Sequence, residues 1–141
     1  MRAVCCTHWL AVRSHPEVAH RDRTPSPLLA SVSGEGQAQF SGDGRWIAYT
    51  SDETGTPEVF VQPFPTTGAK WQVSTGGASD PRWRRDSREL FYLGADGKLT
   101  TVPIKGGGSF EVGAAQVLFQ TGAPTIRGPL VFGNYVPAAD G

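Results

Sequence analysis

The sequence contains an ungapped internal repeat at an offset of 43 residues, where FSGDGRWIAYT (40–50) aligns with WRRDSRELFYL (83–93). A pattern that recurs at a fixed spacing predicts a chain built from structural units of that length. The aligned positions are the structural repeat positions of this chain. They are Phe40, Asp43, Gly44, Ile47 and Tyr49 in the first copy, and Trp83, Asp86, Leu90 and Tyr92 in the second.

Each copy predicts four short strands separated by turns. In the first copy we expect strands at 36–40, 45–51, 58–63 and 70–74, with turns at 41–44 and 52–57. In the second copy the third and fourth strands are expected at 98–103 and 116–120, with a glycine-rich loop between them at 106–108. Pro63 and Pro103 are expected to end corresponding strands, and 26–31 is a further candidate strand.

Four strands in about 43 residues match the size of one propeller blade. The strand at 45–51 is apolar on both faces, because Ile47 and Tyr49 alternate with Trp46 and Ala48. We therefore expect it to be covered on both sides. A plain β-sandwich with two similar hairpins is the alternative interpretation.

The composition favours an all-β fold. The chain has 18 glycines and 11 prolines among 141 residues, 38% hydrophobic residues and 10% aromatics. This is too apolar for a wholly disordered chain and too rich in turn residues for a helical bundle or a coiled coil. No apolar run approaches the length of a membrane-spanning helix. The net charge of zero gives no overall attraction to nucleic acid.

The first 25 residues differ from the rest of the chain, and we expect them to form a poorly structured lead-in. They hold both cysteines, Cys5 and Cys6, and all three histidines, His8, His15 and His20. The spacing of these residues does not match a zinc site. The apolar segment that follows Arg2 is interrupted by Thr7 and His8, which disfavours a signal peptide.

The segment FSGDGRWIAYTSDETG resembles the TolB-type, WD-like propeller repeat, whose core reads approximately F-S-P-D-G-x-x-I-A-Y/F. Gly42 stands where that family usually has proline, and Ser87 replaces the turn glycine in the second copy. Across 26–141, the segments EVFVQPFP, KWQVSTGG and PRWRRDSRELFYL resemble the C-terminal propeller regions of bacterial eukaryotic-like serine/threonine protein kinases.

This resemblance implies an incomplete β-propeller of four-stranded antiparallel blades. The two blades would cover about 36–76 and 79–121, and 130–141 would begin a further blade. In that last segment Asp140-Gly141 corresponds to Asp43-Gly44. A closed propeller has about four to eight blades, so we expect the chain to be a fragment.

The motifs of several enzyme and metal-site classes are missing from the sequence. It has no G-x-S-x-G elbow, and its histidines all precede the repeats, which argues against a Ser-His-Asp hydrolase site there. It has neither the H-R-D nor the D-F-G motif of a kinase, and no calcium loop of D-x-D-x-D-G spacing. We therefore predict no catalytic, cofactor-binding or metal-binding residues, and a chain that is not an enzyme.

The densest basic segment is Arg82-Trp83-Arg84-Arg85, followed by Arg88. Arginine beside an aromatic ring is typical of single-stranded nucleic-acid sites. The acidic residues Asp80, Asp86 and Glu89 lie within the same stretch and offset the charge. We therefore interpret the segment as a solvated blade edge with Trp83 in the core, and we expect no nucleic-acid partner.

These observations predict a non-catalytic interaction or sensor module. The resemblance implies a protein or small-molecule ligand bound on the propeller loops, and a parent serine/threonine kinase. The alternatives are a TolB-like periplasmic scaffold and the propeller part of a serine peptidase. The kinase and TolB-like parents both imply the extracytoplasmic side of a membrane. The coding sequence upstream and downstream distinguishes the three parents.

Overall fold

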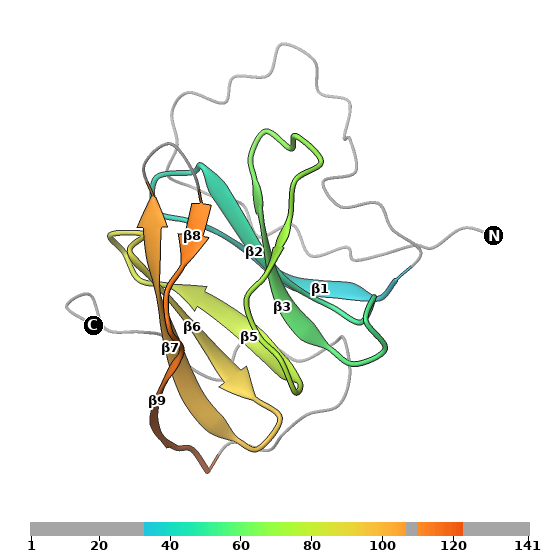
Figure 1. Ribbon diagram of the computed structural model, residues 1–141, viewed down its shortest axis with the longest axis vertical. Helices are drawn as coiled ribbons and strands as arrows, with labels where there is room; N and C mark the ends of the chain where they lie inside the picture. Colours follow the sequence, from blue (N-terminus) through green and yellow to red (C-terminus); the bar gives the residue numbers. More distant parts are fainter. Residues whose placement is uncertain (1–32, 107–109, 123–141) are drawn as a thin grey trace.

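The computed structural model describes residues 33–106 and 110–122, which form two antiparallel β-sheets (Figure 1). Within these ranges the fold is all-β, without a helix. The first sheet consists of β1 (Glu35–Phe40), β2 (Trp46–Ser51), β3 (Glu58–Pro63) and β4 (Trp71–Gln72), in that order. The second consists of β5 (Ala78–Trp83), β6 (Glu89–Gly94), β7 (Lys98–Gly106), β8 (Phe110–Val112) and β9 (Gln116–Gln120).

The strands agree closely with those expected from the sequence, with three differences. Strand β4 is only two residues long, because Val73 and Ser74 contact β3 through single hydrogen bonds rather than a continued ladder. Strand β7 does not end at Pro103 but continues to Gly106, where a loop was predicted. That extension pairs with β8, a strand the sequence did not predict, while β9 pairs with the first half of β7.

The predicted strand at 26–31, the lead-in at 1–25 and the start of a further blade at 130–141 lie outside the described residues.

The 43-residue repeat of the sequence is also a repeat of backbone geometry. In the first sheet Glu35 pairs with Ser51 and Phe40 with Ile47. In the second sheet the residues 43 positions later make the same pairs, from Ala78↔Gly94 to Trp83↔Leu90. The ladder shifts at the same place in both sheets. At that place Gln37 and Asp80 both have left-handed backbones, with φ of 55° and 56°. The second copy therefore reproduces the bulge of the first.

The hairpins that follow also correspond, although the second is three residues shorter. Trp46 pairs with Pro63 in the first sheet, and Glu89 pairs with Pro103 in the second. The outer strands correspond as well, since Phe60 pairs with Gln72 and its equivalent Thr100 pairs with Val117. The segments 70–74 and 116–120 thus supply corresponding outer strands, although their registers are displaced by one residue from the sequence correspondence.

The two sheets pack on each other with unlike faces. One buried cluster joins Ala48, Val59 and Val61 of the first sheet to Leu90, Tyr92 and Val102 of the second. We call the face of the first sheet in this cluster its front. Ile47 and Tyr49, the repeat equivalents of Leu90 and Tyr92, lie on the opposite face with Phe60. The repeat relates the back of the first sheet to one particular face of the second sheet. The front of the first sheet packs against that face.

Aromatic rings close this contact at one end. The ring of Trp46 lies 4.7 Å from that of Phe110 and 5.7 Å from that of Trp71, measured between centroids. Trp46 and Trp71 belong to the first sheet and Phe110 to the second. Offset and edge-on aromatic pairs contribute about 0.5–1.5 kcal/mol each beyond the area they bury. This cluster therefore fixes how the sheets meet.

Strand β2 is buried on both faces, as its sequence predicted. Ile47 and Ala48 are fully buried, and Tyr49 is nearly so. Each buried aliphatic or aromatic side chain contributes about 1.5–3 kcal/mol relative to an exposed one. The strand that carries the repeat pattern is thus the centre of the first sheet.

Candidate functional site

The turn between β1 and β2 is held by short-range hydrogen bonds. Ser41 Oγ donates to Asp43 Oδ1 and accepts from the Trp46 N–H at 3.0 Å. The same Asp43 oxygen accepts from the Arg45 N–H at 3.1 Å. Gly44 has a φ of 70°, a conformation that glycine adopts without strain. Asp43 and Gly44 therefore shape the turn, as the repeat pattern predicted.

The turn between β5 and β6 repeats this construction. Asp86 Oδ1 accepts from the Arg88 N–H at 3.0 Å. Ser87 takes the place of the glycine with a φ of 61°. An L-residue with a side chain pays about 1–2 kcal/mol for this left-handed conformation. The second turn therefore keeps the geometry of the first at some cost in strain.

The two equivalent turns contact each other. The Asp43 N–H donates to Ser87 Oγ at 3.2 Å. A Cβ on Gly42 would lie 2.4 Å from the Arg85 carbonyl oxygen and 3.3 Å from Ser87 Oγ. Side chains cannot approach a backbone oxygen so closely without a shift of the chain. This contact is the physical reason why position 42 is occupied by glycine.

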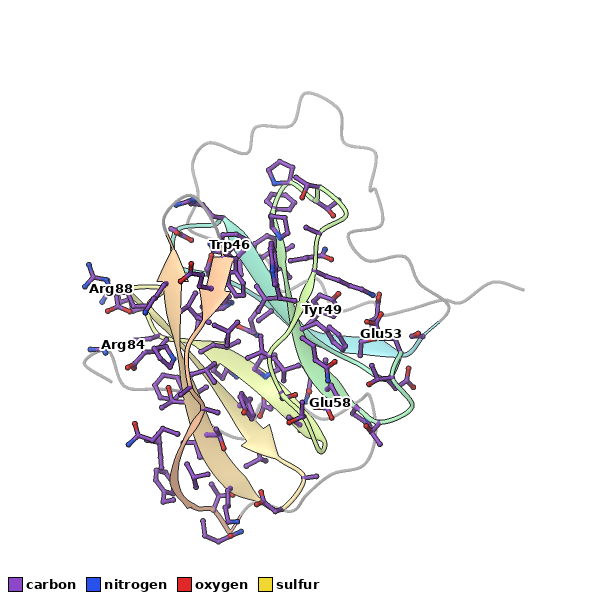
Figure 2. All side chains as sticks on the ribbon, viewed as in Figure 1. Trp46, Tyr49, Glu53, Glu58, Arg84 and Arg88 are labelled. Atoms are coloured by element: carbon purple, nitrogen blue, oxygen red, sulfur yellow. The ribbon has the colours of Figure 1, made fainter. Side chains whose placement is uncertain are left out.

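Exposed arginines gather on these turns. Arg45 lies at the end of the first turn, and Arg85 and Arg88 lie on the second, all with exposed side chains. Figure 2 shows Arg88 together with Arg84 at one margin of the molecule. Arg84 is engaged, since its Nη1 lies 3.3 Å from Glu89 Oε2 and its Nε lies 3.6 Å from Asp86 Oδ2. The guanidinium groups of Arg45, Arg85 and Arg88 are therefore exposed to solvent.

Two aromatic rings extend the same surface. The rings of Phe40 and Phe64 meet edge to face, 5.2 Å apart, with 39% and 36% of each residue exposed. The Phe64 N–H donates to the Arg45 carbonyl oxygen at 2.8 Å, which joins this pair to the first turn. We call the exposed surface of Phe40, Arg45, Phe64, Arg85 and Arg88 the turn face.

The other members of the basic segment have structural roles. Arg82 Nη2 lies 3.1 Å from Oδ1 of the buried Asp80. Trp83 is half-buried, packs against the main cluster and donates its indole N–H to the Gln39 carbonyl oxygen at 3.1 Å. Its placement agrees with the interpretation of the segment as an edge with Trp83 in the core.

The repeat positions divide into three sets. Ile47, Tyr49, Leu90 and Tyr92 are buried, whereas Asp43, Asp86 and Phe40 are exposed at the turn face or beside it, and Gly44 and Trp83 are half-buried. The sequence predicted the turns but not the exposure of Phe64 or the position of Arg45 beside it. Exposure next to a strand depends on how the neighbouring segments fold, which a local pattern does not encode.

A buried carboxylate occurs far from the turn face. Glu58 Oε1 accepts from the Gly77 N–H at 2.7 Å, and its Oε2 accepts from the Ser74 hydroxyl. Burial raises the pKa of Tyr92, and the Glu58 charge adds to this rise. Glu58 therefore ties β3 to the segment that leads into the second sheet.

Within the residues that the structure describes, no three His, Cys, Asp or Glu side chains are grouped as they are around a metal ion. The same residues include no helix long and apolar enough to cross a membrane. No protein-family model matches the sequence, and a search of curated proteins finds no relative.

Proposed function

We propose that this chain is part of a β-propeller of TolB-type repeats and acts as a non-catalytic binding module through its turn face. The proposal is carried by one observation: the register, bulge and turn of the first sheet recur in the second at an offset of 43 residues. Radial repetition of four-stranded sheets is the architecture of propellers. Repeated sheets of this kind stack with the front of one against the back of the next, which is how the two sheets of this chain pack.

The composition of the turn face favours a protein partner. Arginine and aromatic residues are enriched at protein interfaces and account for much of their binding energy. Three exposed guanidinium groups on the turn face favour carboxylates, which accept paired hydrogen bonds from arginine. The partner we propose is therefore an acidic protein segment that also carries apolar side chains for the Phe40–Phe64 pair.

The resemblance to kinase-associated propellers suggests the parent protein. We infer that the module lies C-terminal to a bacterial serine/threonine kinase domain, on the extracytoplasmic side. Reading the adjoining coding sequence in all frames tests this inference. A kinase domain and a membrane span upstream would support it, whereas a downstream hydrolase domain or an upstream signal peptide would favour the peptidase or TolB-like parent.

Selection from a random peptide library displayed on phage tests the binding role of the turn face. The immobilised full chain is expected to enrich acidic peptides. Those peptides should lose at least tenfold in affinity for Arg85→Glu/Arg88→Glu. The matched control Lys70→Glu/Lys98→Glu makes the same change in charge at two ion pairs elsewhere, so it should bind normally. Equal binding to both variants would contradict the role of the turn face.

A serine-directed fluorophosphonate probe tests the absence of enzymatic activity. We expect no labelling of the full chain, because the repeats lack a histidine base. Stoichiometric labelling of a single serine would overturn the non-catalytic assignment.

A further inference from the structure

Strand β9 is the most exposed apolar segment of the described chain. All five of its residues are exposed, including Val117 at 56%, Leu118 at 41% and Phe119 at 57%. Figure 1 shows β9 at the outer margin of the second sheet, and within the described residues it pairs only with β7. We propose that β9 pairs with β9 of a second copy of this chain, antiparallel and across a two-fold axis.

The outer strand of the first sheet is protected from such pairing, whereas β9 is not. Natural sheets protect an edge with short strands, charged residues, proline or bulges. Strand β4 has two residues and is preceded by Lys70. Strand β9 has five residues, and neither a charge nor a proline lies between 113 and 122. Its one protective feature is a bulge, because the ladder with β7 skips Leu118.

The sequence of β9 points to a second copy of this chain as the partner. Gln116-Val117-Leu118-Phe119-Gln120 is nearly palindromic about Leu118. A two-fold contact joins residue i to j and j to i. Centred on Leu118, it places glutamine opposite glutamine and valine opposite phenylalanine on both sides. Cross-strand aromatic and β-branched pairs are favourable, and an uncharged strand brings no like charges together.

The expected dimer is weak. A stable interface buries about 1,200–2,000 Å² in total, which a pair of five-residue strands with their side chains does not reach. We therefore expect a dissociation constant in the range of micromolar or above. Because β9 is uncharged, the association should be nearly independent of salt concentration.

Sedimentation velocity of the full chain tests the association. The weight-average mass is expected to rise from that of a monomer toward twice that value between about 1 and 200 µM. The weight-average mass of Val117→Lys should stay at the monomer value at every concentration. The matched control is Gln72→Lys, since Gln72 is exposed and occupies the equivalent place on β4. A monomer at every concentration, or dimers of Val117→Lys as tight as those of the parent chain, would overturn the proposal.

Cysteine cross-linking tests the register and does not depend on a charged variant folding. In a Cys5→Ser/Cys6→Ser background, Leu118→Cys should form a covalent dimer under mild oxidation. Directly opposed residues have Cβ atoms about 4.5–5.5 Å apart, close to the geometry of a disulfide. Val117→Cys faces phenylalanine in this register, so it should cross-link at least fivefold more slowly. Equal rates for the two cysteines would contradict the two-fold pairing.

Discussion

Gln37 Oε1 accepts a hydrogen bond from the Asp80 N–H at 2.8 Å, so equivalent bulge residues of the two repeats are joined directly. The same oxygen accepts from Thr50 Oγ1 at 2.9 Å. Both Gln37 and Asp80 have left-handed backbones. One side chain therefore holds the bulge of the first sheet, strand β2 and the bulge of the second sheet together.

Replacing this side chain should destabilise the protein. Gln37→Ala removes an acceptor from two donors but leaves the backbone strain unchanged, because glutamine and alanine both carry a Cβ at this φ of 55°. Each lost hydrogen bond costs about 1 kcal/mol. We expect the free energy of unfolding, measured by urea titration, to fall by about 2 kcal/mol. Gln37→Asn, which tolerates the left-handed backbone better, should recover about 1 kcal/mol of this loss; recovery of the full loss would contradict the contribution of the two hydrogen bonds.

Gly42 should not tolerate a methyl group. Gly42→Ala places Cβ against the Arg85 carbonyl oxygen, so the two turns must move apart. We expect a loss of about 1–3 kcal/mol in thermal or urea unfolding, the usual range for overpacking. Gly122→Ala is the control, because a Cβ there meets no atom within 4 Å. Equal stability of the two variants would show that the turns separate without cost.

Gly44 and Ser87 occupy the same left-handed position in the two turns, so each residue can be replaced by the other to measure the cost of strain. Gly44→Ser introduces the strain that the second turn already carries, and we expect it to lower the unfolding free energy by about 1 kcal/mol. Ser87→Gly removes that strain but also removes the 3.2 Å hydrogen bond from Asp43. We expect a small net gain of about 0.5 kcal/mol. The urea midpoint should fall in Gly44→Ser and rise in Ser87→Gly. A rise in Gly44→Ser would contradict a cost of strain at this position.

Tyr49 should make stability fall at high pH. Burial raises its pKa to about 12, with smaller contributions from the charges of Glu53 and Glu35. The unfolded chain loses the phenol proton from about pH 10, whereas the folded chain keeps it, so rising pH favours unfolding. This part of the stability is complete below about pH 10 and is lost progressively toward pH 12. The loss amounts to about 2–3 kcal/mol.

Denaturant titrations between pH 8 and about 11.5 test this dependence. Tyr49→Phe removes the ionisable group and should flatten much of the slope. Burial also raises the pKa of Tyr92, so Tyr92→Phe should leave most of the Tyr49 contribution in place. An unchanged slope in Tyr49→Phe would show that another group controls alkaline unfolding.

The repeat was predictable because its signals are local. An aspartate-glycine turn followed by an apolar strand marks β2, and the same pattern with serine marks β6. The turn at 52–57 was predictable for the same reason, and its Gly55 has a positive φ. Local chemistry therefore identified the central strands and the turns of the candidate site.

Features that depend on distant contacts were not predictable from local sequence alone. Strand β5 reads ASDPRW, where two charges and a proline argue against a strand, and only its correspondence to 36–40 in the repeat predicts one there. It forms because the bulge at Asp80 relieves the ladder beside Pro81, while Arg82 lies beside the Asp80 carboxylate. The exposure of Phe64 also depends on the neighbouring hairpin. These placements depend on partners far along the chain, which a local pattern does not encode.

The front-to-back contact between the sheets has a consequence for assembly. A two-fold contact buries the same surface on both partners, so it is complete after two units. Here the first sheet contributes its front and the second sheet contributes the face that corresponds to the back of the first. Tyr92 therefore lies in the contact, whereas its equivalent Tyr49 packs beside Ile47 and Phe60 on the face away from it. A further sheet added by the same step would meet on the second sheet the same kind of face that the second meets on the first. A contact between unlike faces therefore does not stop at two sheets, as a two-fold contact does.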